Sequence, residues 1–373
     1  MKKSAVLLAL VIVVLVTALP SLAAEYSQSD ASIAWLRQAQ EPDGGFSSGF
    51  AAGSDFGSTA EVILAGVAAG QDVSTWVSVE GNSPLDYVAS QIAGGTVEDT
   101  GNLSKAILVA VATGQDPRDL VGKDLISQLI TQQSSDTGRF GDTLFKHAYA
   151  VLSLHNAGVP VPASAVTAMT STFTEDGAWS LFGDSAPATA DTNTTALVMQ
   201  ALVSVGERDA AAGALPYLRR MQNEDGGFPY QKPSAWGTDS DANSTAVLIQ
   251  ALAALDEPLS NWTVNGTDPL GALLALWDAE SGAYYWQAAV PFANVLATAQ
   301  AVQAAEGMTF TALPKVGASN PPQMTDVATD VMTDATTSPP LLPSSGAHGA
   351  VATEVVMGTI LLLVGLSALL RRK

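Results

Sequence analysis

Two kinds of helical pattern alternate along the chain. Six stretches are apolar and rich in alanine on nearly every face, at roughly residues 57–69, 103–113, 143–157, 192–206, 242–255 and 291–305. A helix that is apolar all round is usually buried on several sides. Each stretch follows a more amphipathic segment, so the pattern predicts twelve helices in six pairs over residues 29–307, with one buried helix in each pair.

A sequence repeat ends the first helix of each predicted pair. The unit Leu-x-x-x-Gln-x-x-Asp-Gly-Gly-Phe is complete at residues 36–46 and 218–228, looser copies end at Phe140, Trp179 and Tyr284, and a faded copy lies at 87–91. Asp-Gly supplies turn residues, and glycine adopts the left-handed conformation that a helix exit often needs. We predict that the aromatic residue after each turn folds back as a buried plug.

Three of the buried stretches begin with closely related polar phrases. These are SDFGSTAEVIL at 54–64, ADTNTTALVMQ at 190–200 and TDSDANSTAVLIQ at 238–250. Asp, Asn, Ser and Thr accept hydrogen bonds from the free N–H groups of a first helical turn, and a negative charge there suits the helix dipole. We interpret the phrases as helix caps.

The same phrases permit a second interpretation. If the buried helices begin at one rim, Asp55, Asp191 and Asp241 point toward a shared mouth. There they could hold a cation or the polar groups of a ligand, or act as a glycosidase-like pair of carboxylates.

The Gln-x-x-Asp-Gly-x-aromatic repeats resemble those of squalene and terpenoid cyclases and of protein prenyltransferase β-subunits. The resemblance covers residues 29–307. It implies an all-α fold, the α6/α6 toroid, in which six inner helices are ringed by six outer ones, with a domain from 25 to 307. Cobalamin carriers related to intrinsic factor share this architecture, and these proteins all use a cavity inside the ring. Fold alone does not determine function.

The chemistry of the resembling enzymes is missing from the motifs. Class II cyclases carry Asp-x-Asp-Asp-Thr-Ala, whose middle acid protonates the substrate, whereas the matching residues here are Gly57, Asn193 and Asn243. A general acid needs a dissociable proton, which asparagine and glycine lack. Prenyltransferases bind zinc through aspartate, cysteine and histidine, and this chain has no cysteine. We therefore assign no catalytic residue, no metal ligand and no cofactor.

Aromatic residues in the loops before the buried helices form a second candidate signal. Rings in loops at one rim suit stacking against a ring or sugar face. Together with the capping phrases they give the candidate ligand-binding set, which is Asp55, Asp191, Asn193, Asp241, Asn243, Tyr230, Trp236, Tyr285 and Trp286.

Charge and composition exclude further classes. The net charge is −20, which repels a phosphate backbone, so we expect no nucleic-acid partner. The absence of cysteine excludes disulfides and thiolate chemistry. The chain has three histidines, too few and too scattered for a histidine-rich metal site.

The ends of the chain predict export and anchoring. Residues 1–24 have the basic start, apolar run and small-residue end of a secretory signal peptide. Residues 308–341 are rich in Pro, Thr and Ser, which predicts a disordered stalk. Residues 342–346, LPSSG, resemble the LPxTG sorting signal of Gram-positive surface proteins, with serine in place of threonine. An apolar segment at 355–370 and a basic tail follow.

The predicted function is that of a surface-anchored extracellular binding module. Its toroid would capture a small ligand, such as a ring-bearing corrinoid, or a glycan. The alternative is an extracellular enzyme, glycosidase-, lyase- or cyclase-like, that uses Asp55, Asp191 and Asp241. A spacer or adhesin domain is a third hypothesis. The C-terminal part would be held either by a membrane span or by covalent attachment to the cell wall.

The two modes of anchoring make different products. If residues 342–346 act as a sorting signal, we expect the mature protein to be joined covalently to wall material and to lack residues 355–373. Mass spectrometry of wall and membrane fractions measures this. An intact C-terminus recovered from detergent-extracted membranes would contradict sortase processing and favour a membrane span.

Overall fold

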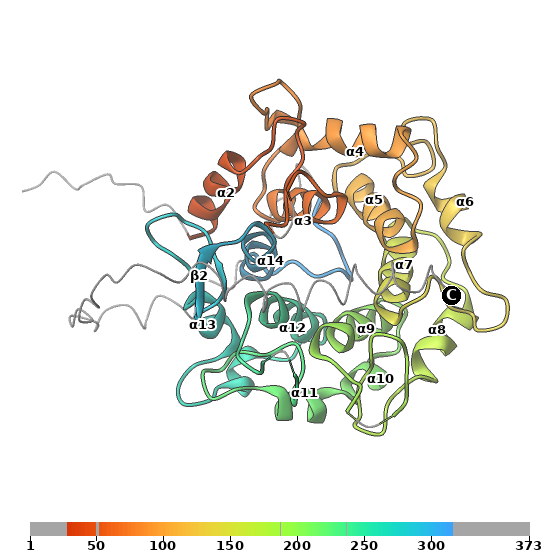
Figure 1. Ribbon diagram of the computed structural model, residues 1–373. Helices are drawn as coiled ribbons and strands as arrows, with labels where there is room; N and C mark the ends of the chain where they lie inside the picture. Colours follow the sequence, from red (N-terminus) through yellow and green to blue (C-terminus); the bar gives the residue numbers. More distant parts are fainter. Residues whose placement is uncertain (1–27, 50–51, 187, 236, 316–373) are drawn as a thin grey trace, which may run out of the picture.

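Long helices packed side by side form a closed ring. The structure is a computed structural model that describes residues 28–49, 52–186, 188–235 and 237–315. Within these ranges the inner helices are α3 (Phe56–Ala68), α5 (Thr100–Ala112), α7 (Leu144–Asn156), α9 (Thr192–Ser204), α12 (Ala242–Ala254) and α14 (Val295–Ala305). Each packs against the next, and α14 packs against α3, which closes the ring (Figure 1).

Shorter outer helices surround this ring. They are α2 (Gln28–Gln38), α4 (Pro84–Ala93), α6 (Leu125–Ile130), α8 (Ala163–Thr170), α11 (Leu215–Met221) and α13 (Pro269–Leu274). Helix α4 packs on α3, α6 on α5 and α13 on α12, whereas α2 contacts both α14 and α3. The sequence-based prediction of an all-α toroid with inner and outer helices is therefore confirmed.

Some elements were not predicted. Helix α10 (Arg208–Ala212) and the 3-10 turns η1 (Val73–Thr75) and η2 (Leu259–Trp262) lie in connections of the ring. Strands β1 (Tyr285–Gln287) and β2 (Val290–Ala293) form an antiparallel hairpin before α14. The stretch predicted as helix from 291 therefore begins as a strand, and the helix starts at Val295 because Asn294 caps it.

The aromatic plugs are buried where the repeat predicts them. Five residues, Phe46, Phe140, Trp179, Phe228 and Tyr284, are at most 1% exposed. The glutamine of the repeat holds the turn before the plug, since Gln222 Nε2 donates to the Gly226 carbonyl at 2.9 Å and to the Trp262 carbonyl at 2.6 Å. Gly226 has a φ of +85°, and an added Cβ would lie 2.6 Å from the Thr267 carbonyl oxygen, so this position requires glycine.

Each plug is tied to the inner helix that follows it. The Phe46 N–H donates to Thr59 Oγ1 at 2.9 Å, and the Phe228 N–H donates to Thr245 Oγ1 at 3.0 Å. The N–H groups of Trp179 and Tyr284 donate to threonines in the same way. In the remaining case the Phe140 N–H donates to Nδ1 of the buried His147 at 2.9 Å. Thr59, Thr195 and Thr245 belong to the predicted capping phrases, so cap and plug form one unit there.

The chain beyond α14 packs into the toroid. Met308, Phe310 and Leu313 are buried, although the sequence assigned residues from 308 onward to the stalk. The Phe310 N–H donates to Gln200 Oε1 at 2.9 Å, and its carbonyl accepts from Asn156 Nδ2 at 2.8 Å. The apolar side chains at 308, 310 and 313 account for this packing.

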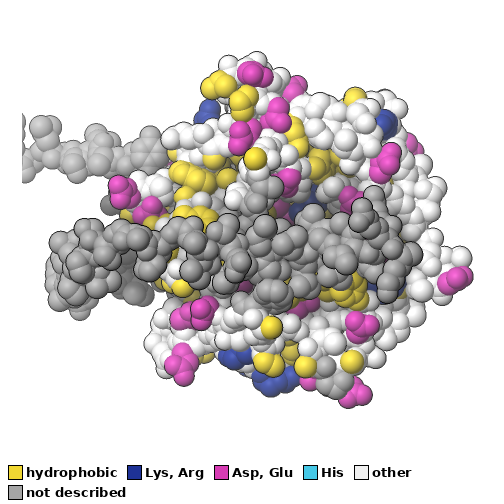
Figure 2. Space-filling view, in the orientation of Figure 1, with side chains coloured by type: hydrophobic (Ala, Val, Ile, Leu, Met, Phe, Trp, Pro, Cys, Tyr) yellow, Lys and Arg dark blue, Asp and Glu magenta, His cyan; other side chains and the backbone are white. Residues whose placement is uncertain are grey.

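The described surface carries scattered charge. On the face drawn in Figure 2, acidic side chains are spread over the toroid and Lys and Arg are fewer. Within the described ranges no helix has both the length and the apolar character needed to cross a membrane. The predicted signal peptide, the sorting motif at 342–346 and the apolar segment at 355–370 lie outside these ranges.

Removing a plug should destabilise the toroid far more than removing an exposed ring. We expect Phe228→Ala to lower the free energy of unfolding by about 3–5 kcal/mol, because it leaves a cavity against Trp262. The matched control is Phe292→Ala on the hairpin, where the ring is 44% exposed and the change should stay within about 0.5 kcal/mol. Urea denaturation of both variants measures this, and equal losses would contradict the role of the plug.

Candidate ligand-binding bore

A side chain caps the first turn of every inner helix. The caps are Asp55, Asp99, Thr143, Asp191, Asp241 and Asn294. Asp55, Asp191 and Asp241 each accept the backbone N–H of the third residue that follows, at 2.7 Å. The interpretation of the polar phrases as helix caps is therefore confirmed.

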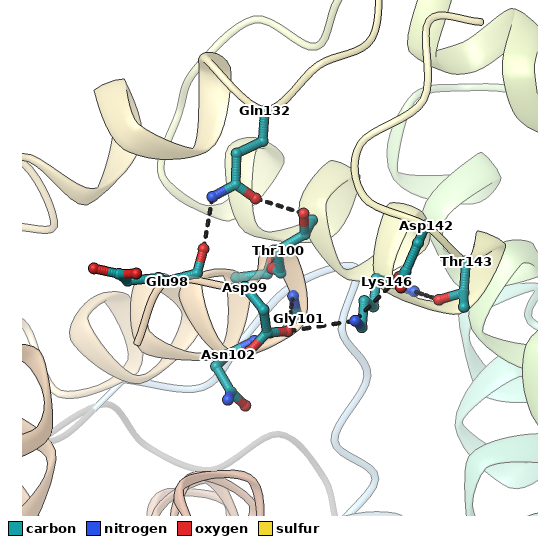
Figure 3. A network of polar contacts seen from close by, with 10 residues as sticks. Glu98, Asp99, Thr100, Gly101, Asn102, Gln132, Asp142, Thr143 and Lys146 are labelled. Carbon is teal, nitrogen blue, oxygen red and sulfur yellow. Dashed lines mark hydrogen bonds and ion pairs between the residues drawn. The ribbon is translucent and has the colours of Figure 1, made fainter. Parts of the chain in front are cut away.

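Polar contacts at the rim join the starts of α5 and α7 (Figure 3). Lys146 on α7 lies 3.7 Å from the cap Asp99 and 3.0 Å from Asp142. Gln132 Nε2 donates to the Glu98 carbonyl at 2.8 Å, and its oxygen accepts from Thr100 Oγ1 at 2.5 Å. Exposed ion pairs of this kind contribute little stability. Lys146 therefore joins the starts of α5 and α7, whereas Gln132 joins the end of α6 to the start of α5.

One stripe of each inner helix faces the interior of the ring, which we call the bore. Residues two, six and nine positions after a cap lie on one helical face. The first level of this stripe, the mouth layer, consists of Gly57, Gly101, Phe145, Asn193, Asn243 and Leu296, all partly exposed. Since Gly57 lacks a side chain, the mouth is open above the Lys105 ammonium, which lies 3.8 Å from the position that a Cβ on Gly57 would occupy.

A buried ion pair stands at the second level of the bore. Glu61 on α3 and Lys105 on α5 are 2.8 Å apart, and Glu61 also accepts hydrogen bonds from Tyr149 on α7 at 3.2 Å and Gln303 on α14 at 2.9 Å. Burial alone would raise the pKa of Glu61, but the Lys105 charge and these hydrogen bonds hold the pKa below its usual value. The cluster links four inner helices.

This cluster was missed at the sequence level, although a signal was present. Glu61, Lys105 and Tyr149 each stand six residues after a cap, and Glu61 and Lys105 are the charged residues of the largely apolar helices α3 and α5. An acid and a lysine at equivalent positions of consecutive inner helices indicate an ion pair across the ring interior.

Two amide groups of α9 each have one atom without a hydrogen-bond partner among the described residues. Gln200 is fully buried; its oxygen accepts from the Phe310 N–H, while Nε2 has no hydrogen-bond partner among the described residues. Nearer the mouth, Asn193 Oδ1 is buried and also has no partner within the described ranges. A buried polar atom without a partner costs about 1–3 kcal/mol. Gln200 is closed off from the surface, whereas Asn193 is partly exposed at the mouth, where a ligand can reach it.

The predicted carboxylates do not gather at one point. In the ring order, α3 lies opposite α9, so Asp55 is across the bore from Asp191. Asp191 and Asp241 cap adjacent helices and are 1% and 4% exposed. Between them lies Tyr230, whose carbonyl accepts from the Thr192 N–H at 2.8 Å.

Burial shifts the acidity of these two caps. It raises the pKa of Asp191 to about 7 and that of Asp241 to about 6. Hydrogen bonds from Thr194 to Asp191 and from Ser244 to Asp241 lower these pKa values, but the effect of burial is larger. Burial and the neighbouring Asp191 also raise the pKa of the Tyr230 hydroxyl.

The other predicted aromatics occupy the hairpin. Tyr285 and Trp286 are partly exposed on β1, which contacts α12 and α14. Trp236 lies outside the described residues. Within the described ranges no group of three or more His, Asp or Glu side chains is placed to hold a metal ion.

A separate groove of about 750 Å³ lies between the 223–225 turn, residues 238–240 and α13. Two of its polar lining groups are already paired, since Asp225 Oδ1 accepts from Gly227 N at 2.9 Å and from Ser240 Oγ at 2.8 Å. The same contact joins Asp43 and Ser54 in the first repeat, so it belongs to the plug turn. The bore, with its unpartnered amides, is the better candidate site.

The buried caps predict that stability falls as the pH rises. A carboxyl group with a raised pKa keeps its proton in the folded chain where the unfolded chain, with a value of 3.8, has lost it. The free energy of unfolding should therefore decrease between pH 3.8 and about 7, by at most about 1.4 kcal/mol per pH unit for each group. Urea denaturation at a series of pH values measures the slope.

Asp191→Asn tests the assignment, because asparagine keeps an oxygen for the cap and does not titrate. This variant should flatten the fall. The control is Asp124→Asn, at a partly exposed cap whose pKa is lowered by hydrogen bonds from Ser127, and it should leave the fall intact. A wild-type stability that rises between pH 3.8 and 7 would contradict the buried carboxyls.

Comparison with known proteins shows the fold. No family model matches the sequence, and no curated protein sequence matches it. Among solved structures, haptocorrin in complex with Cbi is similar with a TM-score of 0.51 and 16% identity, over 79% of this chain and 69% of that one. The type II terpene cyclase MstE from Scytonema, in its apo form, is similar with a TM-score of 0.53 and 14% identity, over 74% of this chain and 96% of that one. The chain therefore has the α/α toroid fold found in a terpene cyclase and in haptocorrin.

Proposed function

We propose that this protein is a binding module that holds a small ligand in the bore of its toroid. The observation that carries the proposal is the polar, partly exposed mouth layer, in which Asn193 and Asn243 stand on the adjacent helices α9 and α12. The partly exposed mouth layer gives a ligand a way in. The similarity to haptocorrin in complex with Cbi supports a toroid that binds small molecules.

The mouth layer argues against cyclase chemistry despite the similarity to MstE. The residues that replace the cyclase acid, Gly57, Asn193 and Asn243, all lie in this layer. None of them can donate a proton to a substrate. The buried acid of the bore, Glu61, is held ionised by Lys105, so it does not supply a proton either.

Export and surface anchoring complete the proposal. They rest on the sequence of residues 1–24 and 342–373, which would place the toroid outside the cell on a stalk and hold it at the membrane or the wall. A glycan would then be as accessible as a small free molecule. Tyr230, Trp236, Tyr285 and Trp286 remain candidates for stacking against such a ligand.

An extracellular enzyme is the second candidate, and one observation favours it. Asp191, with a pKa of about 7 and the Tyr230 hydroxyl beside it, is the kind of carboxylic acid that can donate a proton at neutral pH. Its 1% exposure and its use as a helix cap favour the structural role instead.

Closing the mouth should abolish binding. We expect at least one ligand from a panel of cobinamide, squalene and chito-oligosaccharides to raise the melting temperature of the mature protein. Gly57→Trp should remove that shift, because its ring would fill the mouth layer, where a Cβ meets ordinary contacts of 3.4 and 3.8 Å. Gly57→Ala is the matched control and should retain the shift. Differential scanning fluorimetry measures all three proteins.

Two results would contradict the proposal. If no ligand of the panel changes the melting temperature of the wild type, the proposed binding function is contradicted. If the shift persists in Gly57→Trp, the ligand binds outside the bore. Cyclised products formed from squalene by the wild type, and lost in folded Asp241→Ala, would favour the enzyme instead.

A further inference from the structure

The two complete copies of the repeat build the same turn. Asp43 in the copy at 36–46 and Asp225 in the copy at 218–228 each accept the N–H two residues further on at 2.9 Å. Each also accepts a serine hydroxyl, at 2.6 Å in the first of these copies and at 2.8 Å in the other. The groove of about 750 Å³, which we call the outer groove, lies beside the turn that contains Asp225.

The outer helix beside each turn differs at one position. Helices α4 and α13 both begin with Pro-Leu directly after a capping residue. Four residues after the cap, α4 carries Tyr87 and α13 carries Ala272. A Cβ added to Gly45 would lie 2.8 Å from Cδ2 of the Tyr87 ring, and one added to Gly227 would lie 3.4 Å from Cβ of Ala272. A tyrosine ring therefore packs on the first turn, and a methyl group stands at the corresponding place beside the second.

Tyr87 shows what this position accepts when it is filled from within the chain. The side chain is 5% exposed, so it lies almost wholly between α4 and the turn. Burial, together with the charges of Asp43 and Asp55, raises the pKa of Tyr87 to about 12, and its hydroxyl is therefore the end of the ring near these carboxylates. At the outer groove the carboxylate that corresponds to Asp43 is Asp225, which lines the groove.

One wall of the outer groove is apolar and made of small side chains. Helix α13 contributes Ala272, Ala275 and Leu276, which lie on one face of the helix. The turn of the hairpin, which lies near α13 in Figure 1, adds Ala288 and Ala289. Small apolar side chains leave room for a flat ring and can contact its face.

The opposite wall is acidic. Glu224, Asp225 and Asp239 line it, and the residues that line the groove include no Lys, Arg or His. Neither Glu224 nor Asp239 forms an ion pair with another described residue. Lys232 donates to Asn223 Oδ1 at 2.9 Å but does not line the groove. Charge complementarity therefore favours a cation in the groove and disfavours an anion.

We propose that the outer groove is a second binding site, separate from the bore, and that it takes a small aromatic amine. The ring lies on Ala272 beside the turn, in the place that Tyr87 takes at the other turn, and the ammonium group lies at the acidic wall. Both parts are needed, because the ring supplies the apolar contact and the charge supplies the selectivity. The site does not depend on the proposed function of the bore.

The test fills the groove from within the chain and uses tyramine as the probe. We expect isothermal titration calorimetry to detect tyramine binding to the mature protein and at least a tenfold loss of affinity in Ala272→Tyr. The new ring would take the place that Tyr87 takes on α4, so the melting temperature should not fall. Ala279→Tyr is the matched control, because Ala279 is exposed beyond the end of α13 and does not line the groove. It should change the affinity by less than about twofold.

A second set of measurements tests the charge. Tyrosol, which has the ring of tyramine and an alcohol in place of the amine, should bind at least threefold more weakly, and the anion 4-hydroxyphenylacetate should not bind. Asp239→Asn should weaken tyramine binding about threefold and change tyrosol binding by less than about twofold, since only tyramine carries a charge. Asp239 is exposed, so this variant tests the groove even if Ala272→Tyr fails to fold.

Four results would overturn the inference. They are no binding of tyramine to the wild type, tyramine binding that is unchanged in a folded Ala272→Tyr, equal binding of tyramine and 4-hydroxyphenylacetate, and tyramine binding that Gly57→Trp abolishes. The last result would place the ring in the bore and leave the proposed binding function standing. Tyramine binding that Ala272→Tyr and Asp239→Asn weaken, and that Gly57→Trp leaves intact, supports the second site.

Discussion

The hydrogen bond from the N–H of each buried aromatic plug to the following inner helix is the contact on which the rest of the toroid depends. It joins the end of the outer layer to the first turn of the inner layer, as between Phe228 and Thr245 at 3.0 Å. The cap, as at Asp241, fixes the start of the same turn. Where histidine replaces threonine, burial lowers the pKa of His147 to about 4 and keeps the ring neutral, so Nδ1 can accept the bond. Each of these hydrogen bonds fixes the position of one inner helix along its axis. The positions of the inner helices in turn determine the height at which their side chains lie in the bore.

That constraint leaves one stripe of each inner helix free to carry the proposed binding function. The caps and the apolar faces of the inner helices are committed to the fold, whereas the positions two, six and nine residues after a cap are free to vary in chemistry. The chain places a compensated ion pair, Glu61 and Lys105, on one side and amides on the other. The segment after α14, with Phe310 held between Gln200 and Asn156, packs into the ring and fills part of its interior.

The ring could be predicted from the repeats, because each plug and each cap is specified by residues that are consecutive in the sequence. Helix pairs, plugs and the caps Asp55, Asp191 and Asp241 all follow from such local patterns. The hairpin before α14 and the packing of residues 308–313 depend on contacts with distant segments, which periodicity does not contain. The same limit applies to the site. Asn193 and Asn243 could be identified from the cyclase motif. The contacts of Gln200, Glu61 and Lys105 could not, because they form between helices that only the closed ring brings together.

The side-chain amide of Gln200 gives the most direct measurement of the central claim, that the bore is the ligand site. Its NH₂ resonances can be assigned in ¹⁵N-labelled protein by their loss in Gln200→Leu, and followed while a bound ligand is titrated. The account predicts that these resonances move on binding, because Gln200 lies inside the ring on the same helix face as Asn193 of the mouth layer. Resonances that stay fixed, while those of the 238–240 loop beside the outer groove move, would contradict it.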